Sequence, residues 1–175
     1  MPSFKIAFKT FGKLNSDKNN AILVCHALTG DQYVTENNPI TGREGWWSRM
    51  VGPNKPIDTN KFFVICSNVL GGCAGSTGPK EKQNENSYVY GGDFPSVTIK
   101  DMVKAQSLLI ESLNINKLFS VIGGSMGAMQ ALQWAIDFPE KISNIIHIAG
   151  ALKHSAQNIT RLLKNACFER RLGLS

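Results

Sequence analysis

The feature that most constrains the fold of this chain is the segment VIGGSMGA at residues 121–128, which contains the pattern Gly-x-Ser-x-Gly. A mostly apolar run, 118–122, leads into it, and an apolar stretch that ends near Asp137 follows it. A strand, a sharp turn and a helix in this order strain the backbone of the serine, and the glycines remove side chains where strand and helix pack closely. The segment therefore predicts a nucleophile elbow that holds the hydroxyl of Ser125 away from a sheet.

Apolar runs elsewhere in the chain predict the rest of that sheet. Residues 21–25 and 61–67 are apolar at nearly every position, which is typical of strands that are covered on both faces in a parallel sheet. Residues 142–149 form a further apolar run that predicts another strand. The alternation of Phe and Ile with Lys over residues 4–8 predicts a strand near an edge.

Helical patterns separate these predicted strands. Thr98 and Asp101 match a capping box, and apolar residues follow at helical spacing, which predicts a helix over residues 98–113. The aromatic segment 45–53, closed by Gly and Pro, predicts a short helical piece. Because strands alternate with helices, we expect an α/β fold with a mainly parallel sheet and helices on both faces. The length suits a single domain, 1–175.

The charge and hydropathy of the chain narrow its functional class. The formal net charge is +6, but the basic residues are scattered and the one compact cluster is Arg170–Arg171. This distribution favours a solvated surface over a nucleic-acid interface. The sequence lacks the ~18 consecutive apolar residues of a membrane span. It also lacks the apolar stretch of a signal peptide at its N-terminus, so we expect a cytoplasmic protein.

The cysteines do not indicate a metal site. They show no Cys-x-x-Cys spacing, and two of them lie inside apolar strand-like runs. Buried free thiols in a reducing compartment are therefore expected, rather than zinc ligands or disulfides. The residues concerned are Cys25, Cys66, Cys73 and Cys167.

Two loops at the carboxyl ends of predicted strands supply the surroundings of Ser125. The loop His26–Asp31 occupies a position where open α/β sheets bind ligands. The glycine-rich loop Asn68–Pro79 lacks the Gly-Lys-Ser/Thr of a phosphate-binding loop, and we expect it to line the mouth of the site. The backbone N–H groups of Leu28 and Met126 are the predicted oxyanion-hole donors, since Met126 directly follows the serine at a helix N-terminus, which favours negative charge.

A nucleophilic serine needs a base and a third group that orients the base. In this architecture the chain order is Ser, then Asp or Glu, then His. His26 precedes the serine and is expected to have a positional role, while His147 lies within a predicted strand and is expected to be packed. Only Asp137 and Glu140 stand between the serine and His154, on or just after the elbow helix. We therefore expect no complete triad within these 175 residues.

Several motifs of this sequence occur together in one enzyme family. They are HALTGD at 26–31, GWW at 45–47, SNVLGGC at 67–73 with GSTGP at 75–79, and GGSMGAMQA at 123–131 with Trp134 and Ala135. This combination resembles the N-terminal half of the homoserine O-acetyltransferases of methionine biosynthesis, from about residue 5 to residue 158. Generic esterases share the elbow but not the long Asn-Val-Leu-Gly-Gly-Cys loop.

The resemblance implies an α/β-hydrolase fold and a ping-pong acyl transfer without a permanently bound cofactor. Ser125 would attack acetyl-CoA, and the hydroxyl of L-homoserine would then take the acetyl group from the enzyme. Leu28 and Met126 match the family's oxyanion positions. The resemblance also implies a homodimer. Related enzymes use succinyl-CoA as donor or serine as acceptor, and the motifs do not separate them.

The resemblance also indicates what this sequence lacks. Members of the family are longer, and their Asp, their His and a helical lid lie in the half that has no counterpart here. The chain is thus expected to be a partial domain, truncated before the last strands and the lid, whose strand 142–149 is left unpaired on one side. Such an edge invites aggregation or a complementing C-terminal chain.

Two alternatives to the acyltransferase stay open. One is a serine hydrolase with water as acceptor, against which the extended loop Asn68–Pro79 argues. The other is a non-catalytic remnant, or the subunit of a split enzyme, that pairs through its open sheet edge with a chain supplying Asp and His.

Overall fold

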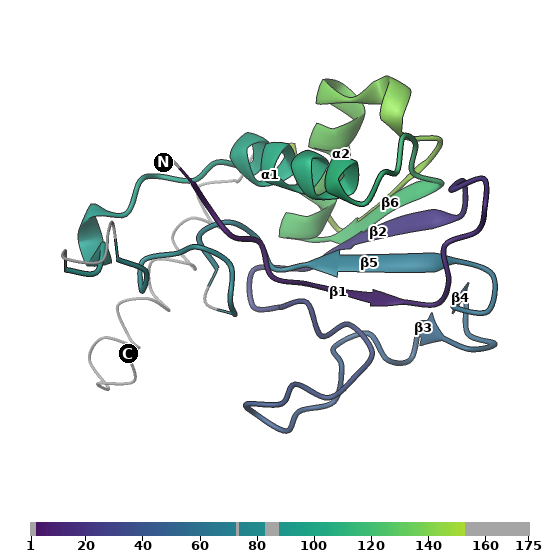
Figure 1. The fold of residues 1–175 in the computed structure, drawn as a ribbon, viewed down its shortest axis with the longest axis horizontal. Coiled ribbons are helices and arrows are strands. Elements are labelled where there is room, and N and C mark those ends of the chain that lie inside the picture. The colour runs from purple at the N-terminus through teal and green to yellow at the C-terminus, as the bar shows by residue number, and fades with distance from the viewer. Residues whose placement is uncertain (1–2, 73, 83–87, 153–175) are drawn as a thin grey trace.

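The centre of the molecule is a five-stranded sheet in the order β1-β5-β2-β6-β7 (Figure 1). The computed structural model describes residues 3–72, 74–82 and 88–152. Four strands run parallel, and β1 is antiparallel to its neighbour β5 at one edge. The strands are β1 (Phe8–Phe11), β2 (Ala21–Cys25), β5 (Phe63–Ser67), β6 (Ser120–Gly124) and β7 (Ile145–Ile148).

Two helices, α1 (Ile99–Ser112) and α2 (Met126–Asp137), cover one face of this sheet (Figure 1). Their apolar sides and the facing strand residues form a buried core that includes the fully buried Trp134. The predicted capping box is present, because the Thr98 hydroxyl accepts a hydrogen bond from the Asp101 nitrogen at 3.2 Å while the Asp101 carboxylate accepts one from the Thr98 nitrogen at 2.9 Å. The α/β class and the mainly parallel sheet are confirmed.

The other face of the sheet differs from the expectation of helices on both sides. In the part of the chain that the structure describes, irregular segments cover this face together with the short strands β3 (Val51–Gly52) and β4 (Ile57–Asp58). A second apolar cluster fills the space between them and the sheet, and Val34 and Val51 are fully buried in it. Two 3-10 turns, Gly91–Asp93 and Pro139–Lys141, complete the elements.

Two predicted elements were misplaced. The segment 45–53 is not a helix but a series of turns over 46–50 that enters β3. The edge strand begins at Phe8 rather than at Phe4, because the preceding residues bond to the glycine-rich loop instead of to a strand. The Lys5 nitrogen donates to the Thr77 hydroxyl at 2.8 Å, for example.

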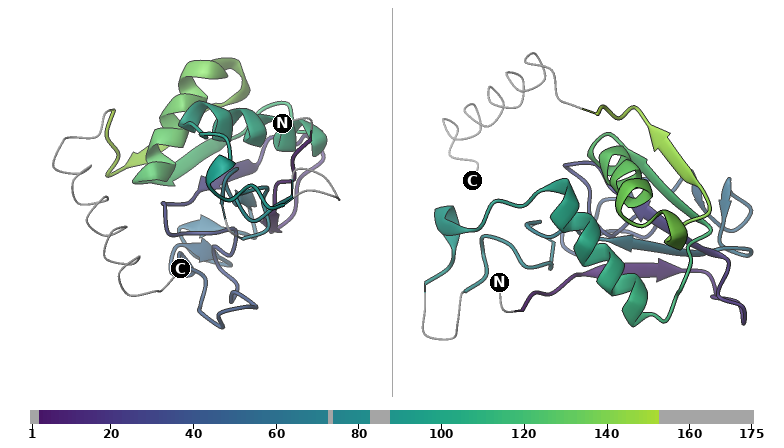
Figure 2. Two further views of the ribbon diagram at one scale, coloured as in Figure 1. Left: turned by 90° about the vertical axis from the view of Figure 1, so that its left-hand side faces the viewer. Right: turned by 90° about the horizontal axis from the view of Figure 1, so that it is seen from above.

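Strand β7 forms the other edge of the sheet, beside α2 (Figure 2). It pairs with β6, and no described residue pairs with its outer side. Ile145 packs into the helix-side core, whereas Ile146 and Ile148 are 47% and 42% exposed on the opposite face. The strand predicted over 142–149 is therefore present but shorter, Ile145–Ile148, and its edge is open and apolar among the described residues. Within the described residues no helix is long and apolar enough to cross a membrane.

Candidate active site

Ser125 occupies the sharp turn between β6 and α2. Its backbone has φ 56° and ψ −118°, a left-handed conformation that costs energy in a residue other than glycine. Its side chain is exposed. A Cβ atom on Gly127 would overlap the carbonyl of Cys25, and one on Gly123 would overlap the carbonyl of Gly127. The predicted strand, strained turn and helix are therefore all present, with glycine where the backbones approach most closely.

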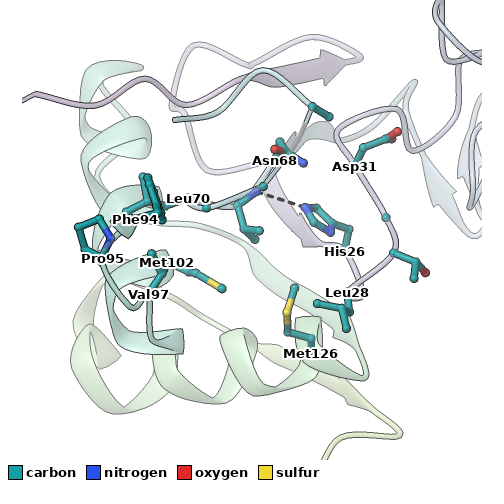
Figure 3. Close-up of a pocket in the computed structure, with 16 residues that line it drawn as sticks. His26, Leu28, Asp31, Asn68, Leu70, Phe94, Pro95, Val97, Met102 and Met126 are labelled. Atoms are coloured by element: carbon teal, nitrogen blue, oxygen red, sulfur yellow. Dashed lines mark hydrogen bonds between the residues drawn. The ribbon is translucent and has the colours of Figure 1, made fainter. Parts of the chain in front are cut away.

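The two predicted oxyanion donors lie at one cavity. Met126 is the first residue of α2, a position at which the N–H has no partner within the helix. Leu28 lies in the turn after β2, and a hydrogen bond of 2.9 Å from the Gly30 nitrogen to the Ala27 oxygen closes this turn. Both residues line a cavity of about 560 Å³, and their side chains lie close together in Figure 3. Their roles as donors stay predictions, but the structure brings the two residues together as these roles require.

His26 joins two loops of the site. It is 1% exposed, its Nδ1 lies 2.7 Å from the Ala27 oxygen, and its Nε2 lies 3.2 Å from the Val69 nitrogen. This arrangement requires the neutral ring with the proton on Nδ1, because Nε2 accepts the Val69 N–H. Burial lowers the pKa of His26, which favours the same neutral form. Both ring nitrogens are thus bonded to backbone, which agrees with a positional role rather than that of a base.

The glycine-rich loop lines the cavity as predicted, through Asn68 to Gly72 and Ala74. The hydroxyl of Ser76 donates to the Asn68 oxygen at 2.7 Å and holds the loop in a tight fold. The Asn68 side-chain oxygen is buried and has no hydrogen-bond partner among the described residues. It is a polar atom at the cavity that the sequence did not single out, since an Asn beside a glycine run is typical of an ordinary turn.

The residues at the far end of the cavity were also not predicted from the sequence. Its lining includes Phe94, Val97 and Met102. The helical spacing of Met102 predicts a core position, and Phe94 lies in a polar, irregular stretch that carries no motif. Only the meeting of the glycine-rich loop with the start of α1 shows that these side chains share a cavity with Leu28 and Met126 (Figure 3).

The described residues do not assemble a triad. His147 is exposed on β7, so the expectation that it is packed is wrong. The open edge explains this exposure. Asp137 lies at the far end of α2, 3.9 Å from the Lys100 ammonium, and Glu140 is exposed beyond it. His154 lies outside the described residues.

The cysteines agree with the expectation where the structure describes them. Cys25 and Cys66 are buried free thiols as predicted, while Cys73 and Cys167 lie outside the described residues. No described group of His, Cys, Asp and Glu could hold a metal ion.

Comparisons with known proteins agree with this geometry. A family model described as the alpha/beta hydrolase fold matches residues 20–166. Homoserine O-acetyltransferases from Nitrobacter hamburgensis and Rhodospirillum rubrum are 58% and 57% identical to this chain over 89% and 88% of its length. The match covers 39% of each of these relatives.

Solved structures show the same relationship. Homoserine O-acetyltransferase from Bacillus anthracis superimposes with a TM-score of 0.87 at 31% identity, over 97% of this chain and 47% of that one. The esterase E22 superimposes with a TM-score of 0.79 at 38% identity, over 88% of this chain and 44% of that one. The chain thus spans less than half the length of these relatives. It belongs to the α/β-hydrolase fold family and is a homologue of the N-terminal part of homoserine O-acetyltransferases.

Proposed function

We propose that this chain carries the nucleophile and the oxyanion hole of a homoserine O-acetyltransferase. The observation that supports this most directly is the strained elbow, which exposes Ser125 directly before Met126, a residue that lines a cavity together with Leu28. The relatives at 57–58% identity give the reaction class.

The proposed reaction has two acyl-transfer steps. The Ser125 hydroxyl oxygen attacks the thioester carbonyl of acetyl-CoA and loses its proton to a base. The C–S bond breaks and protonated CoA leaves. The hydroxyl of L-homoserine then attacks the acetyl-serine, which releases O-acetylhomoserine and restores the Ser125 hydroxyl. The N–H groups of Leu28 and Met126 stabilise the oxyanion in both steps, a contribution on the order of 10²–10³ in rate per donor in serine enzymes.

The base and its orienting acid are the parts that the described residues do not supply. We place them on polypeptide that pairs with the open edge of β7, where the sheet can continue in parallel. Strand β7 is the appropriate junction because its Ile148 oxygen accepts a hydrogen bond from the Ser125 nitrogen at 3.0 Å. Pairing at this edge would therefore also brace the elbow. A homodimer and a cytoplasmic location stay predictions.

Complementation tests the proposal. The chain is co-expressed with the segment of the Nitrobacter hamburgensis relative that lies beyond the matched region, and O-acetylhomoserine is measured with acetyl-CoA and homoserine. We expect turnover from the pair and none from either part alone. Ser125→Ala should abolish turnover, whereas Ser143→Ala, at another exposed serine, should not. Turnover that survives Ser125→Ala would refute the assignment.

Hydrolysis is the second candidate, and the similarity to esterase E22 favours it. The same complemented pair is given p-nitrophenyl acetate with and without homoserine. An acyltransferase should form O-acetylhomoserine in preference to acetate when homoserine is present. Acetate release that homoserine does not change would favour an esterase. Stable association of the two parts without either activity would favour the non-catalytic alternative.

A further inference from the structure

The cavity beside the oxyanion donors has two chemically different ends (Figure 3). Leu28 and Met126 stand at one end. Leu70, Phe94, Val97 and Met102 stand at the other, contributed by the glycine-rich loop, the segment before α1 and the first turn of α1. The Met102 side chain points from α1 towards the Met126 side of the cavity. A group whose carbonyl lies at the donors would therefore extend towards the apolar end.

The charges at this cavity decide which groups it can hold. No described lining residue has a positively charged side chain. The carboxylate of Asp31 points away from the cavity (Figure 3) and accepts hydrogen bonds from the Tyr33 nitrogen at 2.8 Å and the Asn38 side-chain nitrogen at 2.7 Å. His26 also lines the cavity, but burial lowers its pKa and both of its nitrogens are engaged. A carboxylate buried here would lose its hydration without a positive partner, which is strongly unfavourable. The lining therefore disfavours acyl groups that carry a negative charge, such as succinyl.

The apolar end does not exclude small acyl groups, but it leaves them incompletely packed. At about 560 Å³ the cavity is much larger than an acetyl group needs. Each additional buried methylene is worth about a fourfold gain in a binding or rate constant. Met102 is half-buried and unbranched, and such a side chain adapts to chains of different length.

We propose that this cavity takes unbranched, uncharged acyl groups longer than acetyl, and that Met102 sets the length it accepts. The inference rests on the proposed acyl-enzyme at Ser125 and deepens it by naming the class of acyl donor. The cavity accepts propionyl and butyryl groups at least as well as acetyl, and it disfavours succinyl because no described lining residue offers its carboxylate a positive partner.

A thiol at the elbow makes the test independent of the base, which no described residue supplies. In the full chain with Ser125→Cys, a thiolate at the N-terminus of α2 attacks the acyl-CoA carbonyl, the C–S bond to CoA breaks, and the departing CoA thiolate takes up a proton. The purified variant is incubated with acetyl-, butyryl-, hexanoyl- or succinyl-CoA. The acylated peptide is quantified by mass spectrometry, and each rate is divided by that of the same donor with free N-acetylcysteine. Peptide mapping separates the introduced thiol from the native ones.

We expect normalised rates at least about fivefold higher for butyryl-CoA than for succinyl-CoA, and no lower for butyryl-CoA than for acetyl-CoA. Adding Met102→Trp should lower the butyryl rate and leave the acetyl rate unchanged, whereas Met102→Ala should raise the hexanoyl rate. Met102→Lys should raise the succinyl rate. Leu108→Trp, at an exposed position on the same helix, is the matched control and should change none of these ratios.

Four results would overturn the inference. Succinyl-CoA that reacts as fast as butyryl-CoA would show that the cavity does not select against charge. Equal losses of the acetyl and butyryl rates in both Met102→Trp and Met102→Ala would show that Met102 does not set the length. Transfer from no donor would refute the acyl-enzyme itself together with the cavity, whereas transfer without any preference would refute the cavity alone.

Discussion

The backbone nitrogen of Ser125 donates a 3.0 Å hydrogen bond to the carbonyl oxygen of Ile148. The turn that presents the serine is thus fixed on one side by the edge strand β7. On its other side the Ser125 oxygen accepts from the Ala128 nitrogen at 3.0 Å and so begins α2. Because both ends of the turn are bonded, the left-handed backbone of Ser125 persists despite its cost.

Relief of this strain is the first prediction. Glycine adopts φ 56° far more readily than serine does, so Ser125→Gly should raise the free energy of unfolding by about 1 kcal/mol, while Ser125→Ala should leave it nearly unchanged. The urea midpoints of the three proteins measure the difference. A midpoint for Ser125→Gly at or below that of Ser125→Ala would show that the elbow is not strained.

Close packing behind the elbow leads to the second prediction. A Cβ atom on Gly127 would overlap the backbone carbonyl of Cys25 in the central strand β2, and a strand in the middle of a sheet cannot move away without breaking its pairing. Gly127→Ala should therefore lower the free energy of unfolding by more than about 2 kcal/mol. Gly92→Ala is the control, because nothing lies within 4 Å of its Cβ position. Equal urea midpoints for the two variants would contradict the packing.

The elbow and the parallel strands could be predicted because local patterns determine them. The run at 21–25 is apolar throughout, and β2 is buried on both faces. The Gly-x-Ser-x-Gly spacing likewise reflects backbone approaches that only glycine permits. The prediction for segment 45–53 was wrong for the opposite reason: it relied on an aromatic segment closed by Gly and Pro, but Trp46 and Trp47 stack on each other with ring centroids 5.6 Å apart in a series of turns. Contacts with the sheet, rather than periodicity, decide the conformation there.

The hydrogen bonds between polar side chains in the core could likewise not be predicted from the sequence. Gln106 lies on the face of the predicted helix where the spacing places apolar residues. It is 2% exposed and forms hydrogen bonds with α2, β2 and β5. Its amide nitrogen donates to the Gln130 oxygen at 2.8 Å, and its oxygen accepts from the Trp134 ring nitrogen at 2.9 Å. Gln130 in turn reaches the Met126 oxygen at 3.4 Å. Such a network depends on which helices meet, and no pattern within either helix specifies it.

This network gives the third prediction. Gln106→Met keeps the shape of the side chain but leaves the buried Trp134 and Gln130 groups without their partners, at a cost of about 1–3 kcal/mol for each group. We expect the free energy of unfolding to fall by about 2–4 kcal/mol. Adding Gln130→Met should cost less than the sum of the single changes, because it removes one of the orphaned groups. Gln133→Met, at a half-buried glutamine of α2, is the control and should change stability by less than about 0.5 kcal/mol. Strict additivity would contradict the coupling.

The last prediction concerns pH and follows from His26. Burial lowers its pKa from the ordinary value of 6.5, so between that value and the lowered one the unfolded chain binds a proton that the native state does not. The free energy of unfolding must then fall as the pH drops below about 6.5, and it is fully retained above it. Protonation of Nε2 would also abolish its bond from the Val69 nitrogen. The titration of the exposed Asp101 carboxylate lies lower, because its hydrogen bonds with Thr98 lower its pKa below the ordinary value of 3.8.

The urea midpoint should accordingly decrease between about pH 7 and pH 5 in the unmodified chain. His26→Gln should be less stable at neutral pH, since it loses the bridge between Ala27 and Val69, and its midpoint should depend much less on pH over this interval. His147→Gln, at an exposed histidine, should retain the full pH dependence. If both variants lose the same part of the slope, a group other than His26 is responsible. A midpoint that rises towards pH 5 would require a histidine whose native pKa is raised, and this would contradict the neutral, buried ring.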